Sequence, residues 1–270
     1  MPELPEVETT ARGIGPHVIG RTLVAVCVHQ PILRYPVAED LSQILAQQTV
    51  VSLSRRGKYL LMQCERGHLL IHLGMSGCLR MQPTGHRLRK YDHLVWCFDH
   101  GEDLVFNDPR RFGLVLWTTE NPFQHRLLAH LGVEPLTDSF HAEMLYAKAK
   151  TRKQSVKQFI MDHKVVVGVG NIYASEALFM AAIDPRRSCQ RISLARYERL
   201  VMGIKQVLAA AIDQGGTTLK DFSSNHQPGY FQQSLQVYGR HDQPCVHCGN
   251  AIRQVHLGQR NSYFCAHCQR

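Results

Sequence analysis

Four cysteines near the carboxyl end have the type and spacing of a metal site. Cys245 and Cys248 form one Cys-x2-Cys pair, and after sixteen intervening residues Cys265 and Cys268 form a second. Two turns that each present a pair of thiolates suit tetrahedral zinc, and this is the spacing of a four-thiolate zinc ribbon. Because four thiolates leave no open coordination position, we predict one structural Zn²⁺ and no catalytic metal.

Two histidines and a polar segment lie close to these cysteines in the sequence. His247 and His267 lie inside the two pairs, and we expect both to be exposed because the zinc shell is already full. Residues 259–262 form a polar tip that could meet a phosphate. Zinc ribbons also bind proteins or serve only as structural units, so the ribbon alone does not establish DNA binding.

The overall charge points to a polyanionic partner. The chain has 31 basic and 22 acidic residues, a net charge of +9 with histidine neutral. No stretch reaches the roughly 18 consecutive apolar residues of a membrane span. The first eight residues are acidic and broken by prolines, unlike a signal peptide. We therefore expect a cytoplasmic protein, associated with the nucleoid if its polyanionic partner is DNA, and we take a monomer as the default oligomeric state.

The metal-binding cysteines and the basic residues must be positioned by a folded framework. A length of 270 residues suggests two domains or one large domain with an appendage. Leu4, Val7, Ala11 and Ile14 recur at steps of three and four, which predicts an N-terminal helix. Eight short apolar or alternating runs then predict the strands of a β-sandwich or barrel. The runs are Thr22–Val28, Val50–Ser54, Tyr59–Cys64, Leu69–His72, Cys78–Met81, His93–Phe98, Leu104–Asn107 and Leu114–Thr118.

Beyond residue 121 the apolar spacing lengthens to that of helices. The predicted helices are Pro122–Leu131, Ser139–Lys150, Ser155–His163, Ile172–Ala182 and Leu194–Gln214, with one short earlier helix at Asp40–Gln47. Residues 131–136 contain Gly132 and Pro135 and form the best linker candidate. The order is therefore a β-rich part, a helical part and a small metal module.

Four blocks and the ribbon carry a specific resemblance over essentially the whole chain. The blocks are Pro2–Glu8, Ile71–Gly77, Asn107–Gly113 and Gly170–Glu176. With the ribbon, they closely resemble the family of formamidopyrimidine-DNA glycosylases. The resemblance implies a multidomain α+β fold. It has an N-terminal helix and β-sandwich in residues 1–133, a helix-two-turn-helix domain in 134–236 and a zinc-ribbon β-hairpin in 237–270.

The resemblance implies a catalytic role for the first residues of the chain. Removal of the initiator methionine would make the Pro2 amine a nucleophile, which forms a Schiff base with the deoxyribose. Glu3 would be the general acid and base, and Glu6 a buried partner of backbone amides. Pro2 and Pro5 could instead simply initiate a helix, but Pro5 alone accounts for that. Lys58 is grouped with the catalytic residues and would contact a phosphate.

Other matching positions would bind DNA. Met75, Arg110 and Phe112 would fill the space left by an everted nucleotide, although core packing is the competing reading of the two apolar side chains. The expected remaining contacts with DNA are made by His72, Lys157, Asn171 and Arg260. A buried core position for His72 and a helix cap for Asn171 are the alternatives.

A loop after the long helix would cover the everted base in this family. It matches residues 215–222 and 227–231, and Lys220 matches the lysine of that loop. Many relatives have Asp-Gly where this chain has Asn225-His226. A histidine in place of glycine restricts the turn.

The resemblance implies a bifunctional DNA glycosylase and apurinic lyase that excises oxidised purines, 8-oxoguanine opposite cytosine and formamidopyrimidines, with β,δ-elimination. Its partner would be double-stranded DNA with oxidised bases or abasic sites. One alternative is an endonuclease VIII-like enzyme for oxidised pyrimidines, for which we would expect glycine in place of Leu4. The other is a non-catalytic zinc-ribbon DNA-binding protein, which has no need for Pro2 and Glu3.

Overall fold

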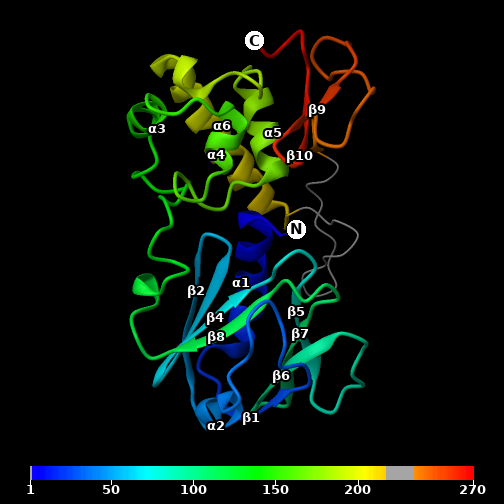
Figure 1. Ribbon diagram of the computed structural model, residues 1–270. Coiled ribbons are helices and arrows are strands. Elements are labelled where there is room, and N and C mark those ends of the chain that lie inside the picture. Colours follow the sequence, from blue (N-terminus) through cyan, green and yellow to red (C-terminus); the bar gives the residue numbers. More distant parts are fainter. Residues whose placement is uncertain (1, 217–233) are drawn as a thin grey trace. The chain divides into compact units, whose positions relative to one another are not determined.

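The computed structural model describes residues 2–216 and 234–270 (Figure 1). They form two compact units. One contains residues 2–129 and 215–216, and the other contains residues 130–214 and 234–270. The helical segment and the ribbon therefore lie in one compact unit.

Helix α1, Leu4–Val18, opens the first unit. Glu3 is its N-cap, and Pro5 lies in the first turn, where a missing backbone N–H costs nothing. Leu4, Val7 and Ile14 of the predicted apolar stripe are buried and Ala11 is half-buried, and Val18 is also buried on this helix. The helix packs against β2, β3 and β5 of the two sheets described next.

Eight strands form two antiparallel sheets of four. Their bounds are β1 Leu23–Val28, β2 Val50–Arg56, β3 Tyr59–Cys64, β4 Gly67–His72, β5 Cys78–Pro83, β6 Asp92–Phe98, β7 Glu102–Asn107 and β8 Leu114–Thr118. The first sheet has the order β1-β6-β7-β5 and the second β2-β3-β4-β8. Buried side chains from both sheets and from α1 join in one apolar core. This confirms the predicted sandwich. The short helix α2, Leu41–Leu45, packs against β1.

The second unit is built around helix α5, Asn171–Met180, in which eight consecutive residues from Ile172 to Phe179 are buried. The neighbouring helices are α3 Ala142–Ala149, α4 Val156–Met161 and α6 Leu194–Asp213. Because α5 contacts α4, α6 and the ribbon, it is the centre of this unit (Figure 1). None of the helices in the two described ranges is long and apolar enough to span a membrane.

The ribbon's hairpin consists of β9, Arg253–Leu257, and β10, Arg260–Phe264. Its small core joins Cys245, Ile252 and Cys265 to Phe179 of α5. The His247 ring lies 4.8 Å from the Phe179 ring. His247 and His267 are both open to solvent rather than buried, as expected of residues outside the metal shell.

The helix predicted for Pro122–Leu131 is wrong. The structure has only a 3-10 turn at Pro122–Gln124, followed by turns. Of this segment only Pro122 and Leu128 are buried, and Phe123 is 54% exposed. A short helix is stable chiefly through a packed apolar face, and this segment has no such face.

Candidate active site and nucleic-acid interface

The first residues of the chain are fixed by the start of α1. Glu3 and Glu6 are each only 2% exposed, and the backbone N–H of Glu3 donates to Oε2 of Glu6 at 2.8 Å. The Glu3 carboxylate accepts in return from the Glu6 backbone, which completes a capping box. Pro2 is buried beside them. The carboxylate of Glu3 is thus held one residue from Pro2, at the helix end where the dipole favours negative charge.

Lys58 lies in the tight turn between β2 and β3, directly after Gly57. Gly57 has a φ of +57°, a conformation that favours glycine, and its carbonyl accepts from Arg55 at 2.9 Å. Arg55 also donates to Glu8 of α1 at 2.8 Å, so the turn is tied to the helix. Tyr59 pairs with His72 across β3 and β4. The sheet therefore brings the two predicted phosphate contacts Lys58 and His72 together.

His72 has a defined protonation state. Burial, with the positive charges of Lys58 and Arg34, lowers the pKa of its imidazole to about 4. Its Nδ1 accepts from the backbone N–H of Gly74 at 2.9 Å. Nε2 then carries the proton of a neutral ring. His72 can donate a single hydrogen bond to a phosphate but brings no charge at neutral pH.

Met75, Arg110 and Phe112 lie on two loops that a buried carboxylate joins. Asp108, which is fully buried, accepts from the Ser76 hydroxyl at 2.7 Å and from Gly113 N–H at 2.8 Å. The Ser76 hydroxyl accepts in turn from the backbone N–H of Arg110 at 3.1 Å. We call residues 73–77 and 108–113, joined in this way, the paired loops.

The paired loops expose their apolar tips. Met75 is 37% exposed and Phe112 is 45% exposed, and the Arg110 guanidinium lies 4.9 Å from the centre of the Phe112 ring. Core packing is therefore wrong as an interpretation of these two apolar side chains. Gly74 has a φ of +65°, and a Cβ there would lie 2.4 Å from the Gly113 nitrogen. Only glycine permits so close an approach of the two loops.

Asp108 and Ser76 were not predicted as functional residues. Their burial and mutual contact arise from pairing between distant segments, which no local pattern reveals. The available signal was their place inside Ile71–Gly77 and Asn107–Gly113. A carboxylate between a proline and a strand is unusual in a core unless it accepts hydrogen bonds.

The four ribbon cysteines form a site with the dimensions of zinc. Their sulfur atoms all lie within 4.8 Å of one another. The Sγ–Sγ distance is 3.5 Å between Cys248 and Cys265 and 3.9 Å between Cys245 and Cys268. A tetrahedron with Zn–S bonds of about 2.3 Å has edges of about 3.8 Å. The backbone N–H groups of His247 and Cys268 lie 3.5 Å from thiol sulfurs, where they can stabilise the negative charge of thiolates.

Lys157 does not lie where a direct DNA contact requires. It is 1% exposed, and its ammonium donates to the Ser262 hydroxyl at 2.8 Å and to the Asn261 carbonyl at 3.3 Å. The prediction that it points to DNA is therefore corrected, because the hairpin of the ribbon covers it. Lys157 instead joins α4 to the strand that begins with Arg260.

Asn171 also donates a hydrogen bond to the Asn261 carbonyl. Its Nδ2 donates to Asn261 O at 3.1 Å. Gly170, not Asn171, is the N-cap of α5, so the alternative of a plain cap is wrong. Arg260 is exposed at the start of β10, beside an open pocket of about 320 Å³ that Lys157 and Ser262 also line. The ribbon hairpin thus brings Lys157, Asn171 and Arg260 close together.

Glu176 is a second buried carboxylate that sequence reasoning missed. It is 4% exposed and accepts backbone N–H groups of Gln236, Val237 and Tyr238 at 2.8–3.0 Å. Burial raises the pKa of this carboxyl group against the effect of these three hydrogen bonds. Glu176 therefore fixes the segment that leads into the ribbon. Lys220 and Asn225-His226 lie outside the described residues.

Fold and cysteine cluster together define a zinc-ribbon protein of the α+β class, and three family models match the chain. The formamidopyrimidine-DNA glycosylase N-terminal domain matches residues 1–115, and the H2TH domain of the same enzymes matches residues 131–223. A zinc finger found in FPG and IleRS matches residues 242–270. The chain belongs to the formamidopyrimidine-DNA glycosylase family.

Known relatives agree with this assignment. The chain is 55% identical over 271 aligned residues to formamidopyrimidine-DNA glycosylase of Syntrophotalea carbinolica, with all of both chains covered. A crystal structure of a mutant Lactococcus lactis FPG with DNA containing Fapy-dG has a TM-score of 0.94, 30% identity and full coverage of both chains. MutM (FPG) of Thermus thermophilus has a TM-score of 0.89 and 34% identity, with 99% and 98% of the chains covered.

Proposed function

We propose that the protein is a bifunctional DNA glycosylase and apurinic lyase that removes oxidised purines, namely 8-oxoguanine opposite cytosine and formamidopyrimidines. The full-length match to family members carries the proposal. In this proposal residues 1–133 carry the catalytic residues, and residues 134–236 and 237–270 bind the duplex. The substrate is chromosomal DNA, so the protein acts at the nucleoid in the cytoplasm.

The nucleophile in this proposal is the Pro2 nitrogen after loss of Met1. An α-amino group has a pKa of roughly 7.7–8.0, against about 10.4 for lysine, so much more of it is neutral near pH 7. Its lone pair forms a bond to C1′ while the glycosidic bond breaks. The base leaves with the electron pair of the glycosidic bond and takes up a proton, and the alkylated proline nitrogen loses its own proton. The C1′–O4′ bond then opens to an iminium, and Glu3 supplies the proton that O4′ needs.

The iminium next serves as an electron sink for strand cleavage. It acidifies C2′, and loss of a C2′ proton breaks the C3′–O bond and expels the 3′ phosphate. Loss of the C4′ proton then breaks the C5′–O bond and expels the 5′ phosphate. We assign Glu3 the transfer of protons between these steps, and its fixed position next to Pro2 in the chain, held by the capping box with Glu6, supports this role.

Chemistry at C1′ requires the nucleotide to leave the stack, which costs a few kcal/mol and less at a damaged pair. In the proposal Met75 fills the vacated space, Phe112 wedges between base pairs and Arg110 contacts the orphaned cytosine. The exposure of Met75 and Phe112 supports these roles. Zinc bound by the four cysteines holds the hairpin that presents Arg260 to a phosphate.

A panel of duplexes with single lesions tests the proposal. Wild-type protein should cleave at 8-oxoguanine opposite cytosine and at formamidopyrimidines. Cleavage confined to oxidised pyrimidines would establish the endonuclease VIII-like alternative. Duplex binding with no cleavage of any lesion would identify a non-catalytic zinc-ribbon protein.

Arg110→Ala should lose discrimination for the base opposite the lesion by about tenfold or more, because a bidentate contact supplies roughly 1–3 kcal/mol of discrimination. General duplex affinity should change less. Cleavage rates of 8-oxoguanine opposite each of the four bases give the measurement. Arg111→Ala, which removes the neighbouring guanidinium, is the matched control. An unchanged preference for cytosine in Arg110→Ala would contradict the role.

Lys58→Ala should make the negative slope of log binding constant against log[salt] shallower by about one. The reason is that a lysine on a phosphate releases about one counterion. His72→Gln should weaken binding but leave the slope as it is, since the pKa of His72, at about 4, keeps the ring neutral at pH 7. Titrations at several salt concentrations and pH 7 measure both. A slope that falls equally in the two variants would refute the distinction.

A further inference from the structure

Three strands of the first sheet meet at the edge from which the paired loops start. In the register of this sheet, Asn107 of β7 faces Cys78 of β5 on one side and Asp92 of β6 on the other. Residues 73–77 lead into β5, and residues 108–113 follow β7. The side chains at this edge therefore lie at the base of both paired loops.

Strand β6 has a bulge at the same edge. Asp92 and Leu94 pair with consecutive residues of β7, so His93 is the extra residue. A bulge redirects the side chains beside it. The buried His93 ring donates from Nε2 to the Asp108 carbonyl at 2.8 Å, and Asp108 N–H donates to the Tyr91 carbonyl at 3.1 Å. The start of β6 thus holds the backbone of Asp108 at both of its polar groups.

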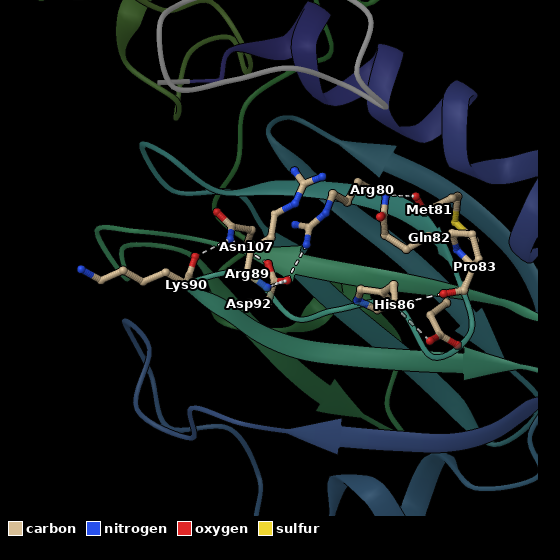
Figure 2. A network of polar contacts seen from close by, with 10 residues as sticks. Arg80, Met81, Gln82, Pro83, His86, Arg89, Lys90, Asp92 and Asn107 are labelled. Carbon is tan, nitrogen blue, oxygen red and sulfur yellow. Dashed lines mark hydrogen bonds and ion pairs between the residues drawn. The ribbon is translucent and has the colours of Figure 1, made fainter.

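A buried ion pair fixes the side chains of this edge (Figure 2). Arg80 and Asp92 are 4% and 6% exposed, and the Arg80 guanidinium donates to Asp92 Oδ2 at 2.5 Å. The same carboxylate accepts from the Arg89 backbone N–H at 2.8 Å and from Asn107 Nδ2 at 2.7 Å. Burial alone would raise the pKa of Asp92, but these hydrogen bonds hold it below its usual range. We call Arg80, Asp92 and Asn107 the strand-end network.

The strand-end network continues into the paired loops through one peptide bond. Asn107 directly precedes Asp108. The Asp108 carboxylate accepts from the Ser76 hydroxyl in one loop and from the Gly113 N–H in the other. A displacement of the backbone at Asn107 and Asp108 would therefore move both loops together.

Stability alone is a weak explanation for the buried ion pair. The cost of removing two charges from water offsets much of their attraction, and apolar side chains of similar volume often stabilise a fold equally well. Hydrogen bonds to a carboxylate are directional, so Arg80 and Asn107 satisfy Asp92 only from defined positions. The strand-end network therefore contributes a fixed geometry at the base of the paired loops.

We propose that Arg80, Asp92 and Asn107 are positioning residues for base-pair opening, because they hold the paired loops in the geometry that enters a duplex. They act through Asp108 and not on the reacting atoms. A displacement of about 1 Å in such a site can cost about 100-fold in rate. This inference rests on the proposed function, since opening of the base pair precedes excision.

Asn107→Ala tests the proposal, because it removes the amide that links Asp92 to β7 and leaves the ion pair with Arg80 in place. Single-turnover rates are measured with the full chain on two duplexes. One contains 8-oxoguanine opposite cytosine and the other a preformed abasic site, and only the first has a paired base to expel. We expect the rate on the first to fall about tenfold or more, and the rate on the second to change less than about twofold.

Base-pair opening can also be measured without any chemistry. 2-Aminopurine next to the lesion becomes more fluorescent when it loses stacking with its neighbour. Wild-type protein should raise this signal on binding, and Asn107→Ala should raise it about tenfold more slowly. Arg80→Met, in protein shown to be folded by circular dichroism, should behave like Asn107→Ala. Arg80→Lys keeps a cation for Asp92 and should retain most of the opening rate.

Ser52→Ala is the matched control. It removes a half-buried side-chain hydrogen bond of 3.0 Å to Gln63 in the second sheet and should leave both rates unchanged. An equal loss on the two duplexes in Asn107→Ala would show general damage and overturn the proposal, as would unchanged rates on both in a folded variant.

The fluorescence measurement separates this proposal from the proposed function. Wild-type protein that opens the duplex but excises no base would refute the proposed function, and the opening rate of Asn107→Ala would then decide the positioning role. Wild-type protein that opens neither duplex would refute both.

Discussion

Protein that keeps Met1 should form no covalent complex with lesion DNA in borohydride, whereas processed protein should be trapped. The cleavage rate should fall at least about 10⁴-fold, the scale of losing a nucleophile. In the unprocessed chain the Pro2 nitrogen belongs to a peptide bond, and its lone pair is delocalised into the carbonyl. It can then neither attack C1′ nor form an iminium.

Two controls separate the nitrogen chemistry from binding. Pro2→Gly, processed to a free amine, keeps a nucleophile and should still be trapped. Reductive methylation makes the proline nitrogen tertiary while lysines keep their charge, so DNA binding should survive and trapping should vanish. Mass spectrometry verifies the terminus in each preparation. Trapping of the Met1-retaining or the methylated protein would show that another amine is the nucleophile.

Cys265→Ser, or removal of zinc by a chelator, should abolish specific duplex binding, with a loss of at least about 100-fold. Cys265 is fully buried in the small core that includes Phe179. Metal binding and folding of such a ribbon are coupled. Without the ribbon the Asn261 carbonyl no longer accepts from Lys157 and Asn171, and Arg260 is no longer held in place.

The N-terminal unit should stay folded in this experiment, because its sheets have a core of their own. Circular dichroism in the β-sheet region and DNA titrations before and after chelation measure the two effects. Cys189→Ser is the matched control, since Cys189 is equally buried in the same unit but lies outside the metal cluster. Unchanged duplex affinity after verified zinc loss would contradict the prediction.

Local pattern was sufficient for the elements that bury a regular apolar face. All eight predicted runs became strands β1–β8, since alternation reports a half-buried sheet directly. It failed at Pro122–Leu131, where good local helix signals have no apolar face to pack. The three-part domain boundaries stay a prediction.

Of the candidate site, the metal cluster was predicted from the sequence, but the surroundings of several other residues were not. The cysteine spacing was enough for the zinc cluster, because the ligands determine their own geometry. Lys157 was expected to point to DNA because it lies on the first helix of the predicted helix-two-turn-helix, but the hairpin that covers it comes from residues about a hundred positions later. Asp108 and Glu176 were missed for the same reason: their partners belong to remote segments of the chain.

The bridge from Ser76 through Asp108 to Gly113 has a mechanical consequence. Neither strip of backbone can retract without breaking a buried hydrogen bond to a carboxylate, and such a bond is expensive to leave unmade. We therefore expect Met75 and Phe112 to insert into a double helix together and not one after the other. During a search along undamaged DNA, the two side chains would move as one rigid unit.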